Sequence, residues 1–289
     1  MDPLTQAITL LRPKALNWKH AEASGNWTKQ FQKTEGVAFC LIAEGTCRLQ
    51  VSGQVSKPLQ QGDFLLLNAP PEWTLAEGAA SPADENGSVT RIFGGHFTFD
   101  TANAALLKGL LPAEVIVRSS DPAAARLCGL LDLIGDEALS DRPGRTLMLE
   151  RLLEAMLVEA IRYAANQINE VRSGLLAGLA DTQIAASLRA LHADMRHSWT
   201  VAQLAAVAGM SRSVFAERFG RIVGLPPIDY LLQWRMAQAK EALRAGHSSL
   251  SQIAFDCGYQ SVSAFSTAFS RTAGCPPARY ASLHGLHRD

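Results

Sequence analysis

The sequence predicts an α+β protein of two domains, an N-terminal antiparallel β-barrel with appended helices and a C-terminal all-α domain. Three observations predict this architecture: short runs of alternating apolar and polar residues over 27–99, apolar residues at helical spacing over 121–166, and a helical pattern that occurs twice over 200–280. The 289 residues suit two domains, and a hydrophobic content of 47% is sufficient for two packed cores.

Short strands separated by Gly and Pro account for residues 27–99. Cys47, Leu49 and Val51 alternate with polar residues, as in a strand with one buried face. The pattern predicts strands over 37–43, 47–52, 64–67 and 90–93, with a loop over 81–88. Several short strands of this kind favour a small antiparallel barrel or a jelly roll.

Three stretches of this region resemble cupins: residues 39–51, the phrase QGDFLLLNAPPEWTL over 61–75, and GGHFTFD over 94–100. Metal-binding cupins hold their ion with two histidines and a glutamate on one strand and a later histidine. This chain has no His-X-His pair, and Trp73 stands near the place of the late histidine. The other donors are scattered in the sequence: His20, Glu35, Glu72 and His96. We therefore expect no metal, no other cofactor and no catalytic residue.

A barrel without a metal still has an interior, which is the natural site for a small-molecule effector. Alternating strand positions provide five candidate lining residues: Phe39, Leu41, Leu49, Trp73 and His96. The same side chains fit a packed core equally well. Trp18 and Trp27 are candidates to close one end of the barrel.

The pattern changes to helical spacing after residue 120. It predicts helices over 124–139 and 146–165, with a break over 140–144. Their apolar faces must be buried either against the barrel or against the same helices of a second chain. Two glycines interrupt the next segment, which is apolar enough to dock on a domain, and Asp181 is expected to cap the helix that follows. The expected organisation is a barrel over 1–120, a helical dimerisation segment over 121–166, a linker over 167–180 and a further domain over 181–289.

Each copy of the repeated pattern, over 200–230 and 249–280, predicts a helix, a tight turn and a second helix. Thr200 with Gln203 has the spacing of a capping box, as has Ser249 with Gln252. The first helix of each copy therefore begins at a marked N-terminus.

The turn and the second helix follow the same plan in both copies. Gly209 and Gly258 fall where a left-handed residue must end the first helix, and serine stands where it can cap the second. Apolar pairs four residues apart must be buried on one face of that second helix: Phe215 with Phe219, and Phe265 with Phe269. The opposite face carries small polar residues and arginines.

This is the layout of a helix-turn-helix motif, whose second helix enters a DNA major groove. Between the copies, residues 228–245 predict one helix of roughly 27 Å, comparable with the ~34 Å between successive major grooves on one side of DNA. The segment over 181–283 resembles the AraC/XylS family of transcription regulators, and GYQSVSAFSTAFSRTAGCPPARY carries the resemblance most strongly. In that family a cupin-type sensor domain precedes the DNA-binding domain. The resemblance implies double-stranded DNA and RNA polymerase as partners and a homodimer in many relatives.

The predicted DNA contacts come from the exposed faces of the two second helices. In the first they are Arg212, Ser213, Ala216 and Glu217 for base edges, with Arg218 and Arg221 nearer phosphate, and Ser211 at the helix start as a further DNA-binding residue. In the second they are Val262, Ser263, Ser266 and Thr267 for base edges, with Arg271 for phosphate and Ser261 at the helix start as a further DNA-binding residue. Because several are small, we expect readout through thymine methyl groups and DNA shape as well as paired hydrogen bonds.

Charge is distributed unevenly although the chain has no net charge. Residues 182–289 contain 11 Lys and Arg against 6 Asp and Glu, a net charge of +5, and residues 1–181 carry −5. Only the C-terminal part has the sign that a phosphate backbone favours.

The remaining features predict a cytoplasmic protein. There is no secretion signal and no apolar stretch long enough to span a membrane. Five cysteines without a Cys-X-X-Cys pair suit free thiols. The predicted function is a sequence-specific transcription regulator that needs no enzymatic activity. Two alternatives stay open: a thiol-based redox regulator using Cys40 and Cys47, and a cupin enzyme with an autoregulatory DNA-binding module.

Overall fold

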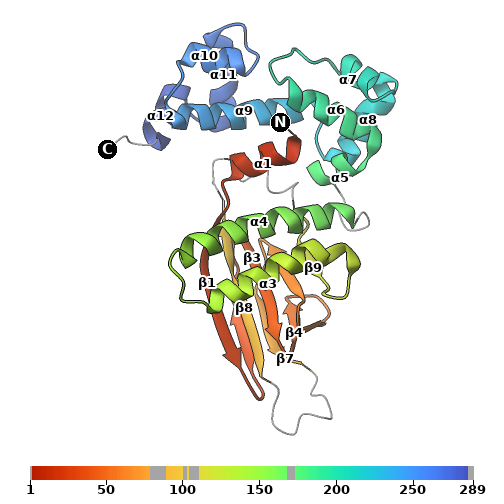
Figure 1. The fold of residues 1–289 in the computed structure, drawn as a ribbon. Helices are drawn as coiled ribbons and strands as arrows, with labels where there is room; N and C mark the ends of the chain where they lie inside the picture. Colours follow the sequence, from red (N-terminus) through yellow and green to blue (C-terminus); the bar gives the residue numbers. More distant parts are fainter. Residues whose placement is uncertain (1, 79–88, 100–102, 104–110, 168–172, 286–289) are drawn as a thin grey trace. The chain divides into compact units, whose positions relative to one another are not determined.

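The computed structural model describes residues 2–78, 89–99, 103, 111–167 and 173–285. The chain forms two compact units (Figure 1). A sheet unit consists of Pro13–Phe99 and Leu111–Glu170, and a helical unit of Met1–Arg12, Asp100–Leu110 and Val171–Asp289. The loop expected over 81–88 lies outside the described residues.

The sheet unit contains two antiparallel sheets packed face to face, so the predicted α+β class with a cupin-like N-terminal domain is confirmed. One sheet has the order β1-β8-β3-β6-β9 and the other β2-β7-β4-β5. The barrel is open, because the edge strands β1 and β2 belong to different sheets and do not pair with each other. The strands are β1 Lys14–Ala23, β2 Thr28–Phe31, β3 Val37–Glu44, β4 Thr46–Val51, β5 Lys57–Gln60, β6 Phe64–Asn68, β7 Trp73–Glu77, β8 Thr90–Thr98 and β9 Glu114–Val117.

The five-stranded sheet is buried on both faces, which explains why its central strands are continuous apolar runs. In β3, Ala38, Cys40 and Ile42 face the second sheet and form a core with Leu49, among others. The alternate residues of β3 are also buried. A strand buried on both sides has no polar face, so it does not alternate.

Two helices cover the outer face of this sheet. Figure 1 shows α3 (Ala125–Leu139) and α4 (Arg145–Asn166) side by side across the strands, after a short 3-10 turn η2 (Pro122–Ala124). Their inward apolar residues are fully buried within the chain, including Leu131, Ile134 and Leu153. The apolar faces therefore pack against their own sheet domain.

The helical unit contains the predicted duplicated pattern. Its described helices are α1 Pro3–Leu11, α5 Leu175–Ala180, α6 Thr182–Ala193, α7 Val201–Val207, α8 Arg212–Val223, α9 Pro227–Ala245, α10 Leu250–Asp256, α11 Val262–Ala273 and α12 Pro277–His284. Asp181 caps α6 by accepting hydrogen bonds from the backbone N–H groups of Gln183 and Ile184. Part of the segment expected as a linker is the helix α5, which packs on α6 and α8. A Cβ at Gly178 would come within 2.6 Å of the end of the Leu188 side chain, so the two helices pack closely at this glycine.

The first helix belongs to the helical unit, whereas the sequence grouped it with the barrel over 1–120. The amide nitrogen of Gln6 donates to the backbone oxygen of His192 at 3.1 Å, and Arg12 forms an ion pair with Glu241. Leu10 and Leu11 are buried. The contact of Gln6 with His192 joins residues 186 positions apart, which no local sequence pattern reveals.

Candidate nucleic-acid interface and ligand cavity

The first helix-turn-helix motif has the predicted caps. The hydroxyl of Thr200 accepts from the backbone N–H of Gln203, and the Gln203 side chain returns a bond to the backbone of Thr200, which completes the capping box. Gly209 has φ +67°, the left-handed conformation expected at the turn. The capping box fixes the start of α7, and Gly209 turns the chain toward α8 after its end.

The second motif repeats this plan with two differences. Ser249 accepts from the N–H of Gln252, but the Gln252 amide donates to Asp256 at 3.0 Å instead, so the predicted capping box is only half formed. Ser261 caps α11 through the N–H of Ala264. Ser211 does not cap α8 with its side chain, because its hydroxyl lies 3.5 Å from that of Ser213. The expectation of a Ser211 cap was wrong.

A matching group of three aromatic rings holds each motif together. Phe219 packs against Phe215 at 5.5 Å and edge-on against Tyr230 at 5.7 Å between ring centroids. Fifty residues later, Phe269 packs against Phe265 at 5.7 Å and edge-on against Tyr280 at 5.4 Å. Because each tyrosine lies on the helix after the motif, the rings fix the recognition helix against its neighbour.

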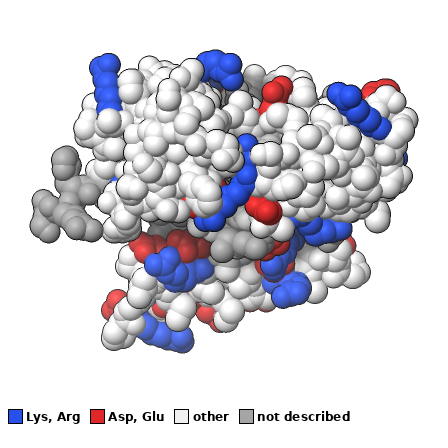
Figure 2. Space-filling view, turned by 90° about the horizontal axis from the view of Figure 1, so that it is seen from above, with Lys and Arg blue, Asp and Glu red and all other residues white. Residues whose placement is uncertain are grey.

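The opposite faces of α8 and α11 are open to solvent. None of the thirteen predicted DNA-contact residues is buried. Ala216, Arg218, Val262 and Ser266 are half-buried, and the others are exposed. Figure 2 shows basic side chains as separate groups on a largely neutral surface.

Arg218 differs from the other arginines of α8 and α11. Its guanidinium lies 2.6 Å from the carboxylate of Asp181 and also donates to Gln183. Burial would raise the pKa of Asp181, but the N–H of Ile184 and the Arg218 guanidinium outweigh it and lower the pKa overall. Arg218 thus ties α8 to α6, whereas no ion pair engages Arg221 or Arg271 within the part of the chain that the structure describes.

The helix between the motifs sets their spacing. With 19 residues, α9 is about 28 Å long at 1.5 Å per residue. It begins at Pro227 and ends at Ala245, and the glycine that follows, Gly246, has φ +66°. Since α9 contacts α8 as well as α10, α11 and α12, it links the two motifs directly.

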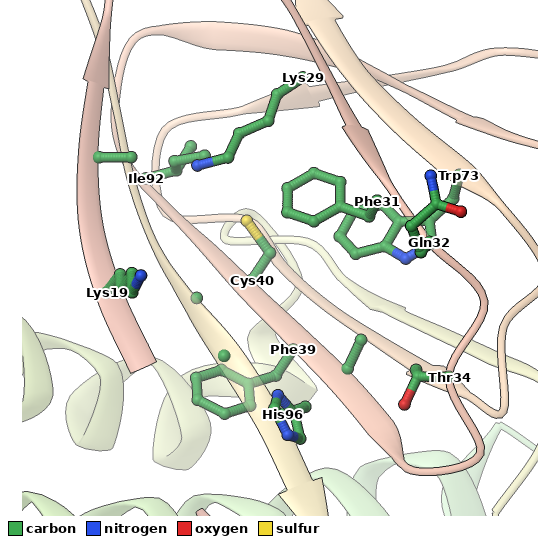
Figure 3. A pocket seen from close by; sticks show the side chains of 14 residues that line it. Lys19, Lys29, Phe31, Gln32, Thr34, Phe39, Cys40, Trp73, Ile92 and His96 are labelled. Carbon is green, nitrogen blue, oxygen red and sulfur yellow. The ribbon is translucent and has the colours of Figure 1, made fainter. Parts of the chain in front are cut away.

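The sheet unit contains a cavity of about 660 Å³ at the open edge between its two sheets (Figure 3). Three of the five predicted lining residues, Phe39, Trp73 and His96, line it. Leu41 and Leu49 do not: Leu49 is packed in the core between the sheets, and Leu41 is buried on the helix-covered face of β3. The lining residues that the sequence did not predict are Lys19, Ala21, Lys29, Phe31, Gln32, Thr34, Ala38, Cys40, Ile92, Gly94 and Gly95.

Small residues create this cavity. Ala21, Ala38 and Gly94 line it where larger side chains would fill the space between the sheets. A side chain at Gly94 would come within 2.9 Å of the Phe39 carbonyl oxygen. On the other side, Phe31 and Trp73 stack with their rings 4.0 Å apart and nearly parallel, which gives the cavity a flat aromatic wall.

The two cysteines of the redox alternative are buried between the sheets. Burial raises the pKa of Cys47 to about 12 and raises the pKa of Cys40 even further. Both are therefore protonated thiols at neutral pH, and a thiol reacts with oxidants much more slowly than a thiolate. This environment weighs against the redox alternative.

Among the described residues, no group of three or more His, Cys, Asp or Glu side chains is placed to hold a metal ion. Nor does any helix within these residues have the length and apolar character needed to cross a membrane.

Comparison with known proteins agrees with this architecture. Residues 2–166 match the family model described as cupin, and residues 204–282 match one described as a helix-turn-helix domain. The fold and the site define a two-domain DNA-binding transcription regulator. An AraC-like transcription regulator of Streptomyces lividans is 38% identical over 97% of this chain and 98% of its own length, and one of Streptomyces antibioticus is 36% identical with the same coverage. The chain belongs to the AraC-like family of transcription regulators.

Among the solved structures that match this chain is that of ToxT from Vibrio cholerae with an unsaturated fatty acid bound. It is 16% identical, with a TM-score of 0.39, and the match covers 96% of this chain and 98% of that one.

Proposed function

We propose that this regulator binds double-stranded DNA with both recognition helices, α8 and α11, inserted into successive major grooves on one side of the duplex. The observation that carries the proposal is the matched construction of the two motifs: each buries an aromatic triad on one face and exposes the corresponding residues on the other. A helix of about 28 Å between them suits the ~34 Å repeat of the groove. Binding of this kind requires no enzymatic activity.

Within this interface we assign the phosphate contacts to Arg221 and Arg271. Both are exposed near the C-terminal ends of their helices at equivalent positions. Base contacts are assigned to the small exposed residues at the start of each helix together with Glu217, which can accept from a cytosine amino group. Arg218 is assigned to the structural contact with Asp181 instead of phosphate.

Alanine at Arg221 or Arg271 is expected to weaken binding to every DNA sequence. Each lost phosphate contact reduces the slope of log affinity against log salt concentration by about 0.9. The measurement is fluorescence anisotropy at several salt concentrations, using a duplex selected from a random pool by the full-length protein. The control is Arg126→Ala. Arg126 is an exposed residue of α3 in the sheet unit, so this variant should leave the slope unchanged. An unaltered slope in R221A and R271A would remove both arginines from the interface.

We further propose that a small-molecule effector occupies the sheet-unit cavity and alters DNA binding. The volume of about 660 Å³ lies within the range typical of small-ligand sites, roughly 300–1,000 Å³. An effector can change DNA affinity only by binding one state of the regulator better than another, and typical coupling energies are about 1–3 kcal/mol.

We propose that the regulator forms a homodimer and acts together with RNA polymerase in the cytoplasm. Although most of the apolar surface of α3 and α4 is buried within the chain, large side chains stay exposed around the turn that joins them. They are Leu133, Leu139, Leu147 and Met148, with exposed fractions of 52–74%. A second copy of the chain would bury this patch, as apolar patches on soluble proteins commonly mark an interface.

A further inference from the structure

We infer that the cavity of the sheet unit takes a carboxylate attached to a flat apolar body, such as an aromatic acid. This inference deepens the proposed effector function and rests on it. It is carried by the position and charge of two lysines at the cavity mouth, and by the aromatic wall behind them.

Lys19 and Lys29 come from the two edge strands that leave the barrel open. Lys19 and Ala21 are alternate residues of β1, and Lys29 and Phe31 are alternate residues of β2; all four line the cavity. Side chains two residues apart point to the same side of a strand. Both lysines therefore occupy positions directed between the sheets, where apolar residues are the rule.

An irregularity of β1 lies directly beside Lys19. Leu16 pairs with His96 and Lys19 with Gly94, so two residues of β1 stand opposite the single residue Gly95. Such a bulge changes which side chains face inward and is often found beside functional sites. It puts Lys19 on the same side of the sheet as His96, which also lines the cavity.

Lys29 reaches inward from the opposite sheet. Its nitrogen lies 5.6 Å from the centre of the Phe31 ring. Figure 3 shows this nitrogen among the lining side chains, between Ile92 and Cys40. Lys19 and Lys29 are both exposed to solvent, so the cavity has a positive charge from each sheet along its open mouth.

The rest of the lining defines the body of the ligand. None of the fourteen lining residues is acidic, so nothing there neutralises the lysines. The stacked rings of Phe31 and Trp73 offer a flat surface for an apolar group. Gln32, Thr34 and His96 add hydrogen-bonding groups at the rim. Positive charge at the mouth with an aromatic wall inside fits a molecule with one anionic end and one flat apolar end.

Inward lysines on edge strands have another known role, which is to prevent edge-to-edge aggregation of sheets. That role requires no ligand and predicts no preference between an acid and its neutral amide. The experiment must therefore compare ligands that differ only in charge.

The test is calorimetric titration of the full-length protein with naphthalene-2-carboxylate and with naphthalene-2-carboxamide, which has the same body without the charge. The carboxylate should bind about tenfold or more tightly than the carboxamide, since a hydrogen bond to a charged group is the stronger one. Lys29→Met and Lys19→Met should each remove most of this preference. Lys33→Met is the matched control, because Lys33 is an exposed lysine of the same region outside the lining, and should keep it.

Absence of carboxylate binding up to about 1 mM, a concentration that detects even weak sites, would overturn the inference, as would equal affinities for the two probes. Equal effects of Lys29→Met and Lys33→Met would assign the lysines to edge protection. Thermal unfolding checks that each variant is folded. DNA binding measured on the same samples separates the two proposals: protein that binds DNA but not the carboxylate contradicts only the ligand class, whereas protein that binds the carboxylate but no DNA contradicts the regulatory function.

Discussion

Replacing Phe269 by alanine is expected to destabilise the helical unit by about 3–5 kcal/mol. The ring is completely buried and contacts both Phe265 and Tyr280. Removing it leaves a cavity under α11, so the recognition helix loses its fixed position and sequence-specific DNA binding falls with stability. Urea unfolding followed by circular dichroism measures the loss, and anisotropy with the selected duplex measures binding.

Phe255 provides the matched control for this prediction. Phe255 lies on α10 and is 56% exposed. The guanidinium of Arg196 lies over its ring, 5.1 Å from the ring centre. Alanine at Phe255 should cost less than about 1 kcal/mol. If F269A and F255A had similar unfolding free energies, the aromatic triad would not be what supports the second motif.

The second large effect is a loss of stability in acid caused by His192. Its ring is neutral and fully bonded: Nδ1 donates to the Gln6 side-chain oxygen, and Nε2 accepts from the Tyr230 hydroxyl, both at 2.7 Å. Burial lowers the pKa of His192 to about 4 from an ordinary value of 6.5. The unfolded chain therefore takes up this proton at a higher pH than the folded chain does.

Stability contributed by His192 is present above pH 6.5 and is lost as the pH falls from about 6.5 to about 4. The difference between the two pKa values corresponds to on the order of 3 kcal/mol. The measurement is the free energy of unfolding in urea at a series of pH values. His192→Gln, which cannot titrate, should show a shallower pH dependence over that window. Parallel curves for the parent and H192Q would mean that another group controls the acid response.

The helical unit was largely predictable because its signals are local. Gly209, Gly258 and the phenylalanine pairs occur at the same places in two copies of one pattern, and each copy supports the interpretation of the other. Ser211 shows the limit of such reasoning. Its type and position suit a cap as well as those of Ser261 do, but the folded conformations differ, with φ −68° at Ser211 and −145° at Ser261.

The sequence predicted a ligand cavity in the sheet unit, but it did not predict most of the residues that line this cavity. The pairing of β1 with β8 joins residues about 70–80 positions apart, and the bulge beside Lys19 decides which side chains face inward. Lys29 and Phe31 lie on a four-residue edge strand, too short to be predicted on its own. Leu49 alternates as a lining residue should, but the five-stranded sheet covers it in the core between the two sheets. Sequence alternation therefore identifies an inward face and cannot separate a packed core from an open cavity.

The central claim is that both helix-turn-helix motifs of one chain read one side of the DNA together. Hydroxyl-radical footprinting of the full-length protein on its selected duplex tests this most directly. For each bound chain we expect two protected segments on the same face of the duplex, separated by about one helical turn, or 10–10.5 base pairs. Arg271→Ala should weaken protection of one segment and Arg221→Ala protection of the other. A single protected segment for each chain, affected by Arg221→Ala alone, would contradict the account.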